Sequence, residues 1–142
     1  MSLFADHSRD ALRAAYREAW RKWRERLPLQ PLEAQIADVI AEHPEYQPLL
    51  QSEDALLQDF PALAGSENPF LHMGLHLALC EQLNTDRPAG ITAIRARLAR
   101  RLESGHAAEH RMIEVLASVL WEAQRGGHAA DDAAYLERLR QL

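Results

Sequence analysis

The sequence lacks the features that mark several common protein classes. It has a single cysteine, Cys80, so it can form no internal disulfide and has no cysteine framework for zinc. No apolar run approaches the roughly 20 residues that a membrane helix needs, and the first ten residues lack the pattern of a signal peptide. A Ser-His-Asp arrangement, a phosphate-binding loop and a dinucleotide-binding glycine pattern are also missing. We therefore expect a cytoplasmic protein with no membrane partner, outside the enzyme classes that these motifs define.

Positive charge is scarce in the first half of the chain outside one segment. Residues 8–27 carry seven Lys or Arg residues and three acids, whereas residues 27–86 carry ten acids and no Lys or Arg. Trp20 and Trp23 lie among the arginines, a pattern that also occurs on nucleic-acid surfaces. On a helix, however, both tryptophans fall on the apolar side. This favours a core or a homodimer interface and disfavours nucleic-acid binding.

The spacing of the apolar residues predicts an all-α fold. A chain of about 150 residues buries roughly two-thirds of its unfolded surface, so residues 1–142 fit a single domain with a sizeable core. We expect a single-domain helical bundle of about five to six helices with a buried central helix. The expected helices cover residues 8–26, 31–43, 69–84, 88–102, 106–125 and 131–141, with a short one at 52–59 in an otherwise irregular segment.

The central helix carries two histidines in an apolar environment. Asn68 is a good N-cap and Pro69 suits the first helical position. From residue 70 to residue 80, every residue except His72 and His76 is apolar or glycine, which predicts a helix buried all round. Cys80 in this helix is expected to act as a small hydrophobe. The two imidazoles lie on one face about one turn apart, and buried polar groups need partners.

The helix expected at 106–125 carries a second such pair. Short turns before and after the helix at 88–102 make the helices on either side of it parallel to each other, so their N-termini share one end. His106 and His110 then lie at the depth of the first pair, and Glu109 faces the buried side of its own helix. A carboxylate in that position needs a partner.

Two interpretations of this cluster remain open. Neutral imidazoles and a carboxylate suit Zn, Fe, Ni or Cu, so His72, His76, His106, Glu109 and His110 are candidate ligands of one divalent transition metal. The alternative is a buried hydrogen-bond network in which Glu109 holds a histidine without any metal. His43, at a helix C-terminus, is interpreted as a surface residue compatible with the helix dipole.

Several blocks of the sequence resemble a known family. These are SRDALRAAYREAWRKWRE, HPEY, NPFLHMGLHLALCEQL, the D-x-P-x-G-I turn, the H-x-x-E-H segment and WEAQRGG. They are similar to the bacterial domain-of-unknown-function family numbered eighteen forty-one, over nearly the whole chain and least between residues 50 and 66. The resemblance implies a small, stand-alone bacterial cytoplasmic protein and brings no assigned activity.

Three classes of function therefore remain. The first is a metal-binding helical protein, acting as a metal-dependent hydrolase or a redox protein. The second is an interaction or adaptor protein with a structural His/Glu network and a homodimer interface on the aromatic N-terminal helix. The third is a nucleic-acid binder that uses this basic helix.

Overall fold

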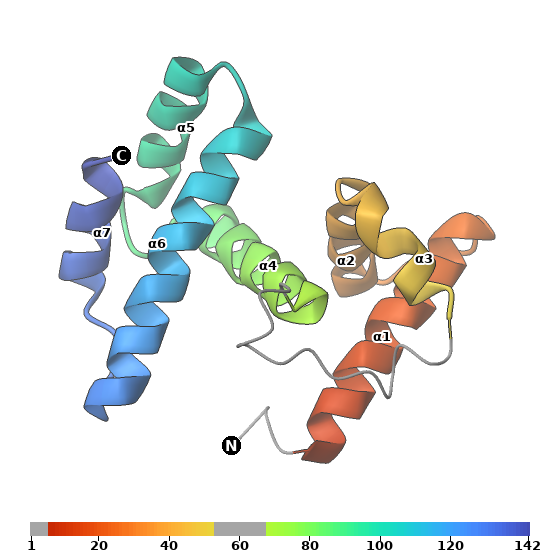
Figure 1. The fold of residues 1–142 in the computed structure, drawn as a ribbon. Helices are drawn as coiled ribbons and strands as arrows, with labels where there is room; N and C mark the ends of the chain where they lie inside the picture. Colours follow the sequence, from red (N-terminus) through yellow and green to blue (C-terminus); the bar gives the residue numbers. More distant parts are fainter. Residues whose placement is uncertain (1–5, 53–67) are drawn as a thin grey trace. The chain divides into compact units, whose positions relative to one another are not determined.

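The computed structural model describes residues 6–52 and 68–142, and all regular structure within these ranges is helical (Figure 1). The elements are α1 (Asp6–Arg24), α2 (Pro31–Ala41), the 3-10 helix η1 (Pro44–Tyr46), α3 (Gln47–Leu50), α4 (Pro69–Thr85), α5 (Ile91–Leu102), α6 (Gly105–Gly126) and α7 (Asp132–Arg140). None of these helices combines the length and the apolar character needed to cross a bilayer.

The all-α prediction is confirmed, although the described residues form slightly more helices than the expected five to six. The additional elements, η1 and α3, lie in the segment after His43 that was expected to be irregular. Proline occupies an early position in each of them, where its fixed φ and missing N–H are tolerated. The short helix predicted at 52–59 lies almost entirely outside the described residues.

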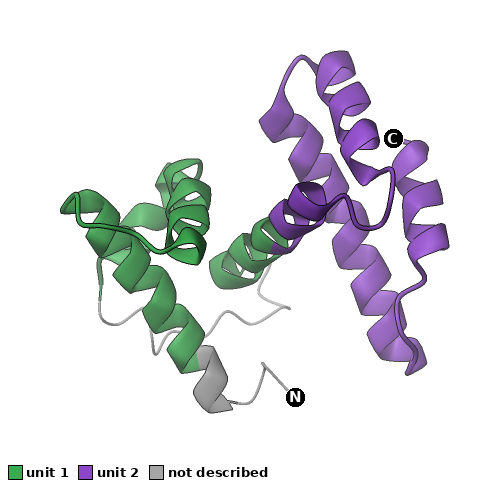
Figure 2. Ribbon diagram, turned by 180° about the vertical axis from the view of Figure 1, so that it is seen from behind, with its two compact units in different colours: residues 1–77 green, residues 78–142 purple. Residues whose placement is uncertain are grey.

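The chain divides into two compact units, residues 1–77 and residues 78–142 (Figure 2). The boundary falls inside α4, so each unit contains one part of that helix. The two units are described separately below. The single domain over residues 1–142 remains a prediction.

In the first unit, a core forms where α1 and α2 pack together with α3 and the start of α4. The buried residues are Tyr16, Ala19, Trp20, Ile36, Val39, Ile40, Leu50, Phe70 and Met73. The rings of Tyr16 and Phe70 stack with their centroids 5.9 Å apart, which joins α1 to α4. Burial also raises the pKa of Tyr16 to about 12, so its phenol stays neutral in the core. This packing fixes α4 against the helices that precede it.

The apolar face of α1 is only partly buried. Trp20 lies in the core, whereas Trp23 stacks on it at a centroid distance of 4.8 Å and remains 46% exposed. Leu12 and Leu27 are also exposed. A homodimer through this face therefore remains a prediction, and the core contribution of α1 is limited to its middle turns.

Burial along α4 follows a stripe. Phe70, Met73, His76 and Leu79 recur every three residues and are buried, which confirms a buried helix on this side. Leu71 is 62% exposed, so the helix is not covered all round as its composition predicted. The cap is as expected, because Asn68 Oδ1 accepts hydrogen bonds from the backbone N–H groups of residues 70 and 71 at 3.0 and 3.2 Å.

The second unit packs α5, α6 and α7 around apolar side chains. Its buried residues are Leu79, Ile91, Ile94, Leu98, Ala108, Met112, Ile113, Leu116, Val119, Ala123, Tyr135 and Leu139. Leu120 of α6 is exposed. The Tyr135 hydroxyl donates a hydrogen bond to Gln82 Oε1 at 2.8 Å, which ties α7 to the end of α4.

The turn before α5 depends on one carboxylate. The N-cap residue of α5 is Gly90, which has no side chain, and Asp86 Oδ1 instead accepts hydrogen bonds from the backbone N–H groups of Thr92 at 3.1 Å and Gly90 at 3.2 Å. The hydrogen bond from Thr92, together with that from Gly90, holds the pKa of Asp86 below its ordinary value of 3.8. Asp86 therefore stabilises the fold as a carboxylate and not as a neutral acid.

We expect Asp86→Ala to lower the midpoint of thermal unfolding at pH 7, because two backbone donors lose their acceptor. A lowered folded-state pKa means that this stabilisation is present above pH 3.8 and disappears as the pH falls below it. Thermal unfolding of both proteins at pH 7 and pH 3 measures the effect. If Asp86→Ala lowers the midpoint by the same amount at pH 7 and at pH 3, the stabilisation does not depend on the ionised carboxylate.

Candidate metal centre

His43 lies just beyond the end of α2, where Pro44 prevents the helix from continuing. Its side chain is only 2% exposed, and its Nδ1 lies 2.7 Å from the carbonyl oxygen of Val39. A carbonyl oxygen can only accept a hydrogen bond, so Nδ1 must carry the proton. In the neutral ring, Nε2 then has the free lone pair, and this nitrogen faces α4.

His72 and His76 lie in the first two turns of α4. They are four residues apart, so their side chains lie on the same side of the helix, as the sequence predicted. His76 is 4% exposed and His72 is half-buried. The buried stripe of α4, which includes Met73, holds the helix against the core and thereby directs both rings toward His43.

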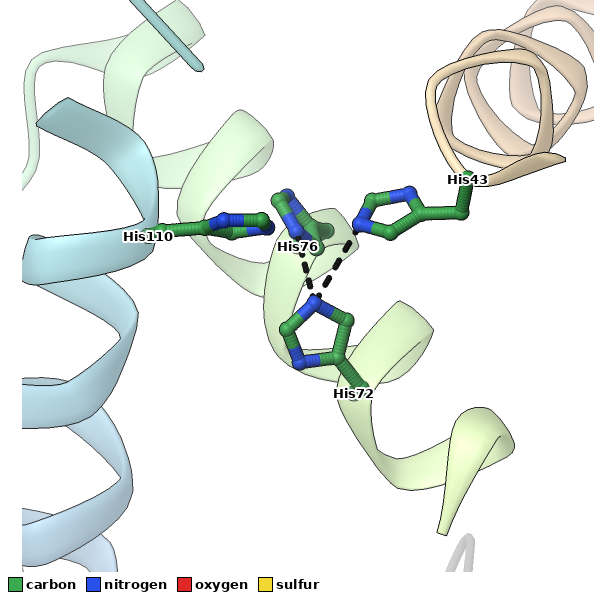
Figure 3. Close-up of side chains that lie close together, drawn as sticks. All are labelled: His43, His72, His76 and His110. Carbon is green, nitrogen blue, oxygen red and sulfur yellow. Dashed lines mark hydrogen bonds between the residues drawn. The ribbon is translucent and has the colours of Figure 1, made fainter. Parts of the chain in front are cut away.

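The three histidines meet at their Nε2 atoms (Figure 3). His72 Nε2 lies 3.2 Å from His43 Nε2 and 3.1 Å from His76 Nε2. One ring nitrogen from each of the three lies within 4.8 Å of those from the other two. A ring nitrogen carries either a proton or a lone pair, so His72 Nε2 cannot donate to one neighbour and accept from the other.

Ring contacts fix the orientations of these side chains. Tyr46, in η1, stacks on His43 with a centroid distance of 5.3 Å and an interplanar angle of 6°. The same tyrosine meets His72 edge to face at 6.0 Å. His43 in turn meets His76 edge to face at 4.6 Å. These contacts restrict rotation of the imidazoles and pre-organise the converging nitrogens.

The separations of the nitrogens are those of ligands that share a metal. Two bonds of about 2.0–2.1 Å place ligand nitrogens roughly 3.3 Å apart at a tetrahedral angle and about 3.0 Å apart at a right angle. The measured 3.1 and 3.2 Å fall between these values. These two separations are therefore compatible with ligands of one transition metal ion.

The structure brings together two of the residues predicted from the sequence and adds one that was missed. His72 and His76 lie side by side as expected, whereas His43 is buried against them and is not the surface residue that its position at a helix end suggested. Its interpretation as a surface residue was therefore wrong. The one signal for it in the sequence is the HPEY block, which belongs to the blocks that carry the family resemblance.

The other three predicted ligands, His106, Glu109 and His110, lie in the first two turns of α6, in the second unit. The ring centroids of His106 and His110 are 4.1 Å apart. Glu109 has a cationic partner, because its Oε2 lies 3.6 Å from Arg95 Nη2 of α5. The side chain of Arg95 thus reaches α6. Metal binding by these residues, and the parallel packing of α4 and α6, remain predictions.

Comparison with known proteins identifies one match. The model of the family described as "Domain of unknown function (DUF1841)" matches residues 8–141. No curated protein and no solved structure matches the chain.

Proposed function

The chain belongs to the DUF1841 family, and because the description of that family assigns no function, we propose one from the site: the protein binds a divalent transition metal ion. Its ligands in this proposal are His43, His72 and His76 of the first unit. His110 stays a fourth ligand predicted from the sequence alone. The convergence of three Nε2 atoms at ligand-to-ligand distances is the observation that carries the proposal.

A metal accounts for this convergence better than hydrogen bonds do. Without a metal, the proton on His72 Nε2 would have to be shared between two neighbours, and a bifurcated bond of this kind is weaker than two separate bonds. A cation at the meeting point accepts all three lone pairs at once. The bond from His43 Nδ1 to Val39 is the outer-shell contact that metal-bound histidines usually make, and it directs Nε2 inward.

The chemistry of the ligands restricts the choice of metal. Neutral imidazoles suit Zn, Fe, Ni and Cu, whereas Mg and Ca prefer oxygen ligands. Each of the four former ions accepts three or four histidines, so the proposal covers this group. Either Lewis-acid hydrolysis or electron transfer is compatible with such a centre.

His110 is proposed as the fourth ligand on the basis of the sequence. Parallel helices would place the histidine pair of α6 at the depth of the pair in α4. Within that pair, His110 is half-buried and His106 is exposed. Glu109 is left out of the ligand set because its ion pair with Arg95 already compensates its charge.

We expect purified protein without a His-tag to carry close to one equivalent of Zn, Fe, Ni or Cu, and His76→Ala to carry little or none. His76 is buried and supplies one of the three converging nitrogens, so its removal leaves two ligands. Elemental analysis of both proteins measures the effect. Metal-free wild-type protein that is not stabilised against heat by adding any of these ions would favour the hydrogen-bond network instead.

A second candidate function, binding of a protein partner, is favoured by the exposed apolar residues at the end of α1 and the start of α2. These are Trp23, Leu27 and Leu32. Nucleic-acid binding has less support, because two cations of α1 already have acidic partners. Arg21 pairs with Glu18 and Glu25, and Lys22 pairs with Glu33.

A further inference from the structure

We infer that a metal ion at this site takes a small anion from solution as an additional ligand. The inference rests on the proposed metal binding and adds the chemical class of a further ligand of the metal. It follows from the charge of the ligands, from their number and from their exposure.

The candidate ligands bring no negative charge. Within residues 6–52 and 68–142, the group of side chains with metal-ligand spacing consists of histidines alone. A divalent ion held by neutral imidazoles keeps its full charge of about +2, whether three or four of them bind. His43 and His76 are almost completely buried, and a buried charge is costly unless an opposite charge accompanies it. An anion is therefore needed beside the metal.

The carboxylate in the predicted ligand set, Glu109, is already engaged. Glu109 lies 3.6 Å from Arg95 in its own unit, and this ion pair balances both charges. Using Glu109 as the counter-charge would leave the arginine without its partner. The negative charge is thus more readily supplied by an exogenous ligand than by this side chain.

The ligand number and the exposure of His72 leave room for such a ligand. Three histidines leave at least one position open on a tetrahedral ion, and four leave one or two on a five- or six-coordinate ion. His72 is the most exposed of the three histidines in the first unit, so solvent reaches the cluster beside its ring. The expected ligand is a small monoanion that binds the metal through an oxygen or nitrogen donor, such as formate, acetate or azide.

The test uses full-length protein without a tag, loaded with Cu(II) and titrated with azide. We expect a saturable azide-to-copper absorption band and a change in the electron paramagnetic resonance spectrum, with acetate competing for the same position. Perchlorate at equal ionic strength, which coordinates metals weakly, is expected to have no effect. His106→Ala is the matched control and should behave like the wild type, because His106 is outside the proposed ligand set.

The possible outcomes separate the two proposals. If copper binds in one equivalent but azide changes neither spectrum, the metal site is closed, and the inference of an anionic ligand is wrong while metal binding stands. If copper does not bind, the proposed function itself fails. If His76→Ala treated with the same amounts of copper and azide gives the same absorption band, the copper and its azide are bound elsewhere and the inference also fails.

Discussion

His43→Ala is expected to weaken metal binding at least 100-fold, whereas His106→Ala should leave the affinity within a factor of about two. Loss of an outer-shell partner alone typically costs about 10- to 100-fold in metal affinity, and loss of a direct ligand costs more. His43 contributes one of the three converging nitrogens, while His106 is exposed on α6. This pair of variants distinguishes two ligand sets. The set proposed from the structure includes His43, and the set predicted from the sequence includes His106.

Competition with a chromogenic chelator measures the two affinities, and circular dichroism of the metal-free proteins shows whether each variant is folded. Since His43 is buried, a second variant, His43→Gln, keeps most of the volume while it removes the imidazole. Unchanged affinity in a folded His43 variant would remove this residue from the site. Loss of metal affinity in His106→Ala would support the ligand set predicted from the sequence, which includes His106.

The helices were predictable because local signals in the sequence mark their ends. Asn68 and Pro69 define the start of α4, and Gly127, with a φ of +67°, ends α6 where a left-handed residue is required. The pairing of His72 with His76 was predictable for the same reason, since it depends only on helical spacing. Features set within one helix could thus be derived from the sequence alone.

The third histidine could not be derived in this way. His43 is 29 residues from His72 in the sequence, and the two meet only because α4 packs on the core formed by α1 and α2. The partner of Glu109 was missed for a related reason. The pair joins Arg95 of α5 to Glu109 of α6, and such a contact between two helices does not follow from the spacing within either one.

Met73→Ala is expected to lower the free energy of unfolding by about 2–5 kcal/mol, the usual cost of truncating a large buried side chain to alanine. Met73 is fully buried among Tyr16, Ile40 and the other core residues of the first unit. It lies next to His72 on α4, so its packing fixes the helix that carries two proposed ligands. We therefore also expect weaker metal binding in the folded variant, because α4 loses part of its packing against the core of the first unit.

Leu71→Ala is the matched control, because it changes the residue on the other side of His72. Leu71 is 62% exposed, and truncation of an exposed side chain usually changes stability by less than about 0.5 kcal/mol. Urea unfolding of the metal-free proteins gives both free energies, and chelator competition gives the affinities. Equal destabilisation by the two substitutions would show that α4 does not pack by its Met73 side. A destabilised Met73→Ala with unchanged affinity would instead show that the histidines hold their arrangement without this part of the core.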